Sequence, residues 1–336
     1  MTTVYVREHG AVVRKQGEQL LVTQGQQITL KIPVAELTQL VLMGNVQLTT
    51  PAAVLLLRME VDVVLMSYNG TFYGRLNLNT SKFAELRHQQ LRLCDDAARS
   101  LALAANIVGG KVANQRVVLM RRADDDPTTI QSSVDGMMTM FKRAATAHDL
   151  DQLRGFEGKA AAYYFQGMRA LLSPDWGFEG RQYYPPPDPI NALLSLAYTL
   201  LRKDIEARLQ WVGLDPYLGF FHTLGYDRPA LALDLMEEFR PSVADLVVLN
   251  LVREGQITGA DFSITSNPKF PIRMKNSAVT QVVAAYEARL ETRVQPPAAT
   301  GQNGQHTYRS IMDMQAYQIA RVVRAEQAVY EPLVMR

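Results

Sequence analysis

The sequence predicts a mixed α+β fold, in which a small β-rich N-terminal domain precedes a mainly α-helical domain. Residues 3–76 consist of short runs rich in β-branched residues, separated by glycine-containing turns. After Leu78, apolar residues recur at helical spacing instead. The length of 336 residues is enough for two domains, each with its own hydrophobic core. We therefore expect one domain at residues 1–78 and a second at residues 79–336.

The N-terminal domain contains seven runs that we interpret as strands. An Asn69-Gly70 pair between the last two runs is a strong signal for a β-hairpin. One helix interrupts the strands at residues 50–61, with Thr50 as its N-cap and Pro51 at its first helical position. The expected strands span residues 3–8, 11–16, 19–24, 27–32, 37–44, 62–68 and 71–76.

Helices dominate the second domain, and Gly and Pro residues punctuate them. The first begins at Ser81, which we interpret as its N-cap. Residues 295–306 are polar and rich in Gly and Pro, so we interpret them as a flexible linker, followed by a C-terminal helix. The expected helices span residues 81–108, 109–122, 129–146, 148–153, 157–172, 188–210, 215–224, 230–238, 241–253, 275–293 and 308–330.

Composition narrows the class of protein. The net charge is only +2, so a nucleic-acid surface must come from local clustering of basic residues. Cys94 is the sole cysteine, which excludes an intrachain disulfide and a cysteine-rich metal site. The N-terminal segment does not resemble a signal peptide, and no apolar run approaches the roughly 20 residues that span a bilayer. We therefore expect a cytoplasmic protein with no membrane partner.

Three carboxylates and one imidazole form the most informative group of residues. Asp234 and Glu237 lie three residues apart on an expected helix, so they share a face. His222 precedes that helix, and Glu157 lies at the expected start of another. An oxygen-rich set with a single nitrogen suits Mg²⁺ or Mn²⁺ better than a structural zinc ion. Such ions are common catalysts of phosphodiester chemistry.

Each of these residues also has a purely structural interpretation. A carboxylate such as Glu157 is favoured in the first turn of a helix by the helix dipole. His222 lies in the apolar stretch YLGFFHTL, where a lone histidine is more often a hydrogen-bonded core residue. Asp234 and Glu237 are consistent with a solvated helix face, although the leucines around them favour burial, and a buried carboxylate needs a charge partner or a metal. Spacing alone does not show that the four residues converge.

Basic and aromatic residues of the helical domain are candidates for nucleic-acid contact, because phosphates require cations and bases stack on rings. Arg181 and Arg240 flank the acidic segments, and we single them out as DNA-binding residues. The alternatives are an ordinary helix surface and, for Arg240, an ion pair with Glu237 three residues away. The sequence contains no phosphate-loop motif, dinucleotide glycine fingerprint, HExxH motif or nucleophile elbow.

Four segments occur in an order that resembles a known family. They are GFEGKAAAYYF, PPPDPINALLSLAYTLL, GLDPYLGFFHT and RPALALDLMEEFRP. Together they resemble CRISPR-associated protein one, the integrase and endonuclease of spacer acquisition, over nearly the whole chain. The resemblance implies that Glu157, His222 and Glu237 are catalytic metal ligands. It also implies that Asp234 is a further ligand or a carboxylate that supports the ligands.

Two details of the motifs bear on this assignment. Asn191 matches the asparagine of the family's PxNALL segment. Glu238 stands where many relatives carry proline, which leaves an ambiguity between Glu237 and Glu238. We assign the ligand to Glu237, because it lies three residues after Asp234 and three before Arg240.

The resemblance also implies an activity and partners. It implies a Mg²⁺- or Mn²⁺-dependent enzyme that joins the 3′-hydroxyl ends of captured double-stranded DNA to the CRISPR array by transesterification. It implies a homodimer formed through the N-terminal domains, bridged by the small ferredoxin-like CRISPR-associated protein two. Two alternatives remain open: a stand-alone metal-dependent DNA nuclease, and a non-catalytic helical DNA-binding protein.

Overall fold

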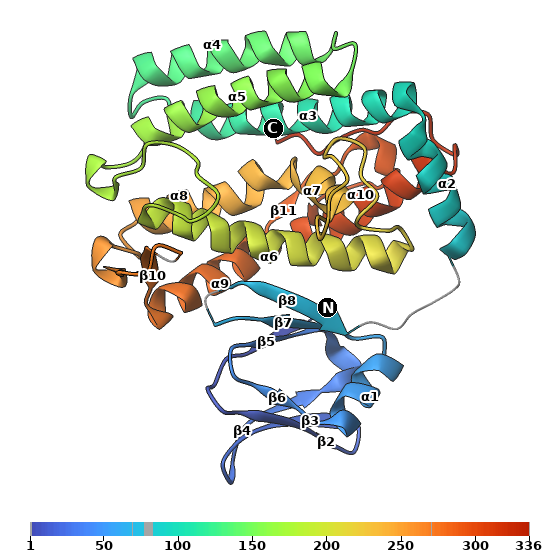
Figure 1. Cartoon of the computed structure of the whole chain (residues 1–336), viewed down its shortest axis with the longest axis vertical. Coiled ribbons are helices and arrows are strands. Elements are labelled where there is room, and N and C mark those ends of the chain that lie inside the picture. Colours follow the sequence, from blue (N-terminus) through green and yellow to red (C-terminus); the bar gives the residue numbers. More distant parts are fainter. Residues whose placement is uncertain (1, 69, 77–82, 270, 336) are drawn as a thin grey trace. The chain divides into compact units, whose positions relative to one another are not determined.

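The computed structural model describes residues 2–68, 70–76, 83–269 and 271–335, and its two compact units are Met1–Ser81 and Lys82–Arg336 (Figure 1). The first unit contains most of the strands and the second is mainly helical, which confirms the predicted fold class. The domain boundary expected after residue 78 falls outside the described residues. Among the described helices, none is long and apolar enough to cross a membrane.

The N-terminal unit contains two four-stranded sheets. The strands are Thr2–Val6 (β1), Val12–Gln16 (β2), Gln19–Gln24 (β3), Gln27–Pro33 (β4), Leu37–Met43 (β5), Gln47–Leu48 (β6), Asp62–Met66 (β7) and Phe72–Leu76 (β8). In the sheet of order β1-β5-β7-β8, only the pairing of β7 with β8 is antiparallel. In the sheet of order β4-β3-β2-β6, β6 is parallel to β2 and the other pairs are antiparallel.

The residues that alternate along these strands explain the core of this unit. Val13 of β2, Leu40 of β5 and Val63 of β7 are buried in one cluster with Leu56 of helix α1, Thr50–Arg58. Helix α1 begins one residue before the predicted position, with Thr49 as N-cap. β7 and β8 pair as the predicted hairpin, although Asn69 of the turn lies outside the described residues.

The helical unit is built around two groups of helices. The helices are Ala84–Asp95 (α2), Ala97–Met120 (α3), Pro127–Ala144 (α4), Leu150–Ala170 (α5), Pro189–Val212 (α6), Ala230–Met236 (α7), Leu246–Arg253 (α8), Asn276–Leu290 (α9) and Tyr308–Val323 (α10). Helices α3, α4 and α5 pack on one another, whereas α6 contacts α7, α8, α9 and α10 (Figure 1).

Aspartate caps set several helix boundaries that the sequence prediction misplaced. Asp96 accepts a hydrogen bond from the Arg99 N–H and caps the start of α3. The expected helix 81–108 is therefore divided between α2 and α3, and α3 continues through most of the segment expected as a separate helix at 109–122. Asp149 caps α5 in the same way, so the segments expected at 148–153 and 157–172 form one helix. A side-chain oxygen that accepts a backbone N–H at a helix start stabilises that start.

Residues 295–306, which the sequence predicts to be a flexible linker, carry local structure instead. Short strands Arg293–Val294 (β11) and His306–Thr307 (β12) pair, and a 3₁₀ turn lies at Ala298–Thr300. The N–H groups of Ala298 and Ala299 donate to the carboxylate of Glu331. Sequence composition does not predict these long-range hydrogen bonds, and by itself it indicates a linker. A second short hairpin, Phe262–Ile264 (β9) with Ile272–Met274 (β10), was likewise not predicted.

Candidate active site

Asp234 organises the loop that joins α6 to α7. Its Oδ2 accepts hydrogen bonds from the N–H groups of Phe220 (2.6 Å) and Phe221 (3.0 Å), and its Oδ1 accepts one from the N–H of His222 (2.9 Å). Backbone N–H groups directed at a carboxylate are not available to a helix, so the helix predicted at 215–224 is wrong and the segment forms turns. Gly219 permits this close approach, because a Cβ there would lie 2.6 Å from a backbone carbon of Ala230.

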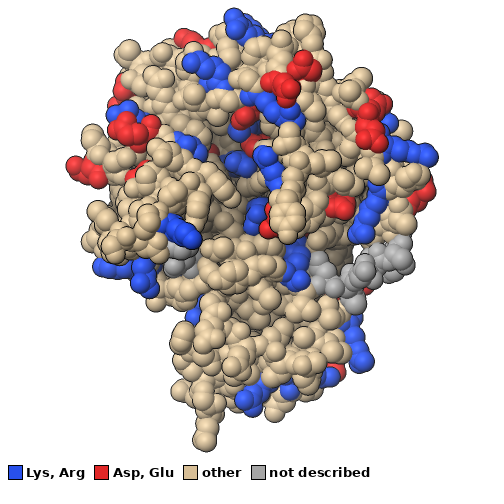
Figure 2. Space-filling view, viewed as in Figure 1, with Lys and Arg blue, Asp and Glu red and all other residues tan. Residues whose placement is uncertain are grey.

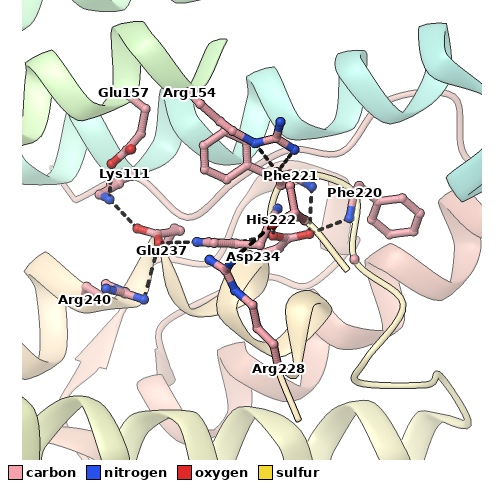
Figure 3. Close-up of polar contacts among 12 residues, drawn as sticks. Lys111, Arg154, Glu157, Phe220, Phe221, His222, Arg228, Asp234, Glu237 and Arg240 are labelled. Carbon is pink, nitrogen blue, oxygen red and sulfur yellow. Dashed lines mark hydrogen bonds and ion pairs between the residues drawn. The ribbon is translucent and has the colours of Figure 1, made fainter. Parts of the chain in front are cut away.

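The same carboxylate fixes the orientation of the histidine. Asp234 Oδ1 lies 2.7 Å from Nδ1 of His222. An acceptor at this position assigns the proton of a neutral imidazole to Nδ1 and leaves the lone pair on Nε2. Nε2 lies 3.5 Å from Oε1 of Glu237 (Figure 3). The hydrogen bond at Nδ1 fits the structural alternative for His222, a hydrogen-bonded core histidine, while the contact of Nε2 with Glu237 places the imidazole beside a candidate metal ligand.

Glu157 and Glu237 meet at a lysine that the sequence interpretation did not single out. Oε1 of Glu157 and Oε2 of Glu237 each lie 2.5 Å from Nζ of Lys111, on α3 (Figure 3). Glu157 lies well inside α5 rather than at a helix start, so the helix-dipole explanation for this carboxylate no longer applies. Glu237 directly follows α7 and its side chain is only 3% exposed, so it does not belong to a solvated helix face.

The charges in this site are strongly coupled. Burial raises the pKa of Glu237, but Arg240, Lys111 and His222 outweigh burial and lower it to about 2. Burial lowers the pKa of Lys111, but Glu157 and Glu237 outweigh it and hold that pKa above its ordinary value. Glu237 and Lys111 are therefore both ionised near neutral pH. The buried charges compensate one another, as charges in a protein interior must.

Glu157, His222 and Glu237 carry the kinds of donor atom that bind a divalent metal, although Lys111 contacts both carboxylates. In the described part of the chain, no three His, Cys, Asp or Glu side chains stand in the geometry of a metal site. Oε2 of Glu237 is buried, and the Lys111 ammonium compensates its charge. It faces the space that Glu157 and Lys111 share, and Nε2 of His222 faces the same carboxylate. Two carboxylates and one imidazole are the ligands that we expected for Mg²⁺ or Mn²⁺.

Asp234 contributes differently from the other three residues. Each of its oxygens accepts two hydrogen bonds from the loop, so its role in the structure is to hold His222. Arg154 of α5 supports the same loop, because two of its nitrogens donate to the carbonyl oxygen of Phe221. The one sequence signal for Lys111 was its charge within the largely apolar run IVGGKVANQRVV. No sequence signal indicated Arg154.

Glu238 lies in a separate environment from its neighbour Glu237. Its carboxylate accepts hydrogen bonds from the hydroxyl of Tyr330, the amide of Gln315 and the N–H of Leu333, all near the C-terminal end of the chain. Burial raises the pKa of Glu238 to about 7 despite these donors. The structure thus brings Glu237, and not Glu238, together with Glu157 and His222.

Arg181 and Arg240 lie on the same tyrosine. The guanidinium of Arg240 is 4.8 Å from the centre of the Tyr198 ring and that of Arg181 is 5.2 Å from it. Arg240 also lies 3.4 Å from Oε1 of Glu237, which is the ion pair that the spacing allowed. Oδ1 of Asn191 accepts a hydrogen bond from Arg181, so the matching asparagine positions that arginine. Figure 2 shows a hollow in the helical unit with Lys and Arg side chains inside it and at its rim.

Comparison with known proteins identifies the family. A family model described as "CRISPR associated protein Cas1" matches residues 4–288. The chain is 37% identical to CRISPR-associated endonuclease Cas1 3 of Thermus thermophilus, over 99% of this chain and 97% of that protein. It is 33% identical to CRISPR-associated endonuclease Cas1 1 of Moorella thermoacetica, over 100% of this chain and 99% of that protein. The chain therefore belongs to the Cas1 family.

Solved structures agree with this fold. A chain of a Cas6-RT-Cas1–Cas2 complex is 25% identical, with a TM-score of 0.86 over 100% of this chain and 36% of that longer chain. A Cas1 protein from Thermotoga maritima is 22% identical, with a TM-score of 0.81 over 99% of this chain and 100% of that chain. The order of a β-rich unit and a helical unit is thus shared with solved Cas1 structures.

Proposed function

We propose that this chain is a metal-dependent DNA integrase and endonuclease of CRISPR adaptation. The observation that carries the proposal is that Glu237 meets Glu157 at Lys111 and lies 3.5 Å from His222, whose imidazole Asp234 orients. Membership of the Cas1 family supports it, since relatives over the full length are named endonucleases. The metal would be Mg²⁺ or Mn²⁺, held by the two carboxylates and by Nε2 of His222.

The reaction is a transesterification. A 3′-hydroxyl of the captured DNA attacks a phosphodiester of the array, a new P–O bond forms and the bond to the leaving 3′-oxygen breaks, while a proton passes from the attacking to the leaving oxygen. A divalent ion held by Glu157, His222 and Glu237 would supply Lewis-acid stabilisation of charge on the phosphate oxygens. Asp234 keeps the imidazole in the tautomer that offers Nε2. Arg240 and Lys111 add positive charge beside the carboxylates, where a phosphodiester would otherwise be repelled.

The proposal includes partners. Double-stranded DNA is the substrate, both as captured fragment and as CRISPR repeat, and the Lys and Arg side chains in and around the hollow support this assignment. Arg181 and Arg240 are proposed to contact its phosphates. We further propose a homodimer and an assembly with the small ferredoxin-like protein Cas2, since a similar solved chain belongs to a complex that contains Cas2.

An integration assay tests the activity. Purified protein with Cas2, a short duplex and a repeat-bearing plasmid should give joined product in Mn²⁺, and Glu157→Gln, His222→Gln and Glu237→Gln should each reduce it at least about a hundredfold. Glu326→Gln removes an exposed carboxylate outside the site and is the matched control. Wild-type yield from all three site variants would reject the metal-site assignment.

A DNA duplex without a free 3′-hydroxyl separates integration from simple cleavage. A duplex with 3′-phosphate ends lacks the nucleophile, so joining should stop, while any hydrolysis by water should continue. Plasmid cleavage that is equal with both duplexes, without joined product, would identify a stand-alone nuclease. Duplex binding that is independent of Mn²⁺, with neither joining nor cleavage, would identify a non-catalytic DNA-binding protein.

A further inference from the structure

Lys111 holds the position that the two proposed ligands share. Its ammonium lies 2.5 Å from Glu157 and 2.5 Å from Glu237, and its side chain is only 8% exposed (Figure 3). Without a cation there, two carboxylates would face each other in a mostly buried site, and uncompensated buried charges are strongly destabilising. Lys111 therefore compensates the charge of both carboxylates.

We propose that Lys111 is a built-in counter-ion that a divalent cation displaces, so that this lysine sets the metal affinity of the site. The inference rests on the proposed metal-dependent function and extends it to a residue that acts in both states. In the metal-free state the ammonium neutralises the two carboxylates. In the metal-bound state the ammonium leaves them and is available to phosphate oxygens of the DNA.

The geometry sets the two cations in competition. Mg²⁺ and Mn²⁺ bind carboxylate oxygens at about 2.1 Å and would compete for the two carboxylates that Lys111 contacts at 2.5 Å. An ammonium and a divalent ion within a few ångströms also repel each other strongly in a poorly solvated site. Lysine has a flexible four-carbon stem, which allows its charge to move without a change in the backbone of α3.

The alternative is a fixed structural ion pair. In that case Lys111 preorganises Glu157 and Glu237, and its removal would lower both stability and metal affinity. The displacement model predicts instead that removal of Lys111 raises the metal affinity, because an internal competitor reduces the apparent affinity by the fraction of sites that it occupies. The two interpretations therefore predict opposite changes in metal affinity, which is measured without enzymatic turnover.

Calorimetric titration with Mn²⁺ measures that quantity. Lys111→Gln should bind Mn²⁺ at least about tenfold more tightly than wild type, whereas Lys111→Arg, which keeps a cation, should not. Lys142→Gln removes an exposed lysine of α4 and should leave the affinity unchanged. Melting curves without metal show whether each variant is folded, and Lys111→Gln should gain more melting temperature from Mn²⁺ than wild type does.

Chemical labelling in the wild-type protein gives a second, independent measurement. Acylation of the Lys111 amine, followed by mass spectrometry of its peptide, should be slow without metal and several-fold faster with saturating Mn²⁺. Lys142 should show no change. Unchanged labelling of Lys111, or a Lys111→Gln affinity equal to or weaker than that of wild type, would overturn the displacement model while leaving the proposed function standing. Absence of Mn²⁺ binding in every variant and in wild type would overturn both.

Discussion

Asp234 uses both of its oxygens on groups of its own loop, and this distinguishes it from the proposed metal ligands. Three backbone N–H groups and the imidazole Nδ1 converge on it, and the residue is fully buried. An amide in its place offers one acceptor oxygen and no charge, so the loop and the imidazole would lose their common anchor. We infer that Asp234 acts through His222 and is not itself a ligand.

Replacing Asp234 tests this orienting role. Asp234→Asn should weaken Mn²⁺ binding by about ten- to a hundredfold, which is typical when the residue that orients a metal-binding histidine is lost. Amide hydrogen exchange should also become faster at residues 220–222. Asp215→Asn is the matched control, since the Asp215 side chain accepts a local hydrogen bond from the N–H of Tyr217 in the same loop. Calorimetry that gives wild-type affinity for Asp234→Asn, with unchanged exchange, would contradict the role.

Glu238 gives the helical unit a defined dependence on pH. Its pKa is raised from 4.5 to about 7 by burial, so the folded state binds a proton that the unfolded state has released. The stability from this group is complete below about pH 4.5 and is lost as pH rises through about 7. Glu238→Gln cannot titrate. Between pH 5 and pH 8, wild type should therefore lose on the order of 1–3 kcal/mol relative to this variant.

Urea unfolding at several pH values, followed by helical signal, measures this difference. Asp245 has a pKa raised to about 6 by burial, and its contribution has the same sign. Because Asp245 is present in both proteins, the difference between wild type and Glu238→Gln isolates Glu238. Parallel stability profiles for the two proteins would show that Glu238 is already ionised in the folded state.

At the scale of elements, the sequence predicted the existence of most helices and strands better than their boundaries. Apolar spacing identified α4, α6, α9 and α10, because each buries a continuous face. It failed for residues 215–224, where a carboxylate 12 to 14 residues away takes the backbone N–H groups. Contacts between distant segments leave no periodic signal in a single sequence.

Two adjacent glycines of α3 should respond differently to a methyl group. The C-terminal segment packs on this helix, and a Cβ at Gly110 would lie 2.4 Å from Cβ of Pro332. Among the described residues outside α3, a Cβ at Gly109 would meet Phe141, at an ordinary 3.5 Å. Gly110→Ala should therefore destabilise the protein by about 1–3 kcal/mol, whereas Gly109→Ala should be neutral or stabilise it by up to about 1 kcal/mol. Chemical denaturation of both variants checks the contrast, and equal stabilities would mean that the segment does not dock on α3.

At the scale of the whole molecule, the sequence predicted the order of the two units, but it did not predict that the site residues come together. Residue types indicated Glu157, His222 and Glu237, and the resemblance gave their roles. Their convergence depends on α5, on a loop and on the end of α7, which only the folded chain brings together. Lys111 is separated from Glu237 by more than a hundred residues, so no local pattern connects them.

The N-terminal unit offers a surface that is suited to the proposed homodimer. β4 is an edge strand, and its Ile28 and Leu30 are 47% and 40% exposed, with Leu30 opposite Val22 and Ile28 opposite Thr23 across a register shift. An exposed apolar edge strand in a stable protein is usually covered or paired. We therefore expect two copies to meet along β4.

Carboxylates introduced along β4 test the proposed homodimer. Light scattering after size exclusion should give a dimer for the wild-type chain at micromolar concentration, and Ile28→Glu with Leu30→Glu should shift it to monomer, because like charges would be buried against each other at the interface. Lys31→Glu places a carboxylate on the face of the strand opposite to Leu30 and should leave the dimer intact. The integration assay links assembly to function, since a bridged assembly needs dimers and the monomeric variant should lose joining while it retains Mn²⁺ binding. A wild-type chain that is strictly monomeric would reject the homodimer, and a dimer that tolerates both edge carboxylates would move the interface away from β4.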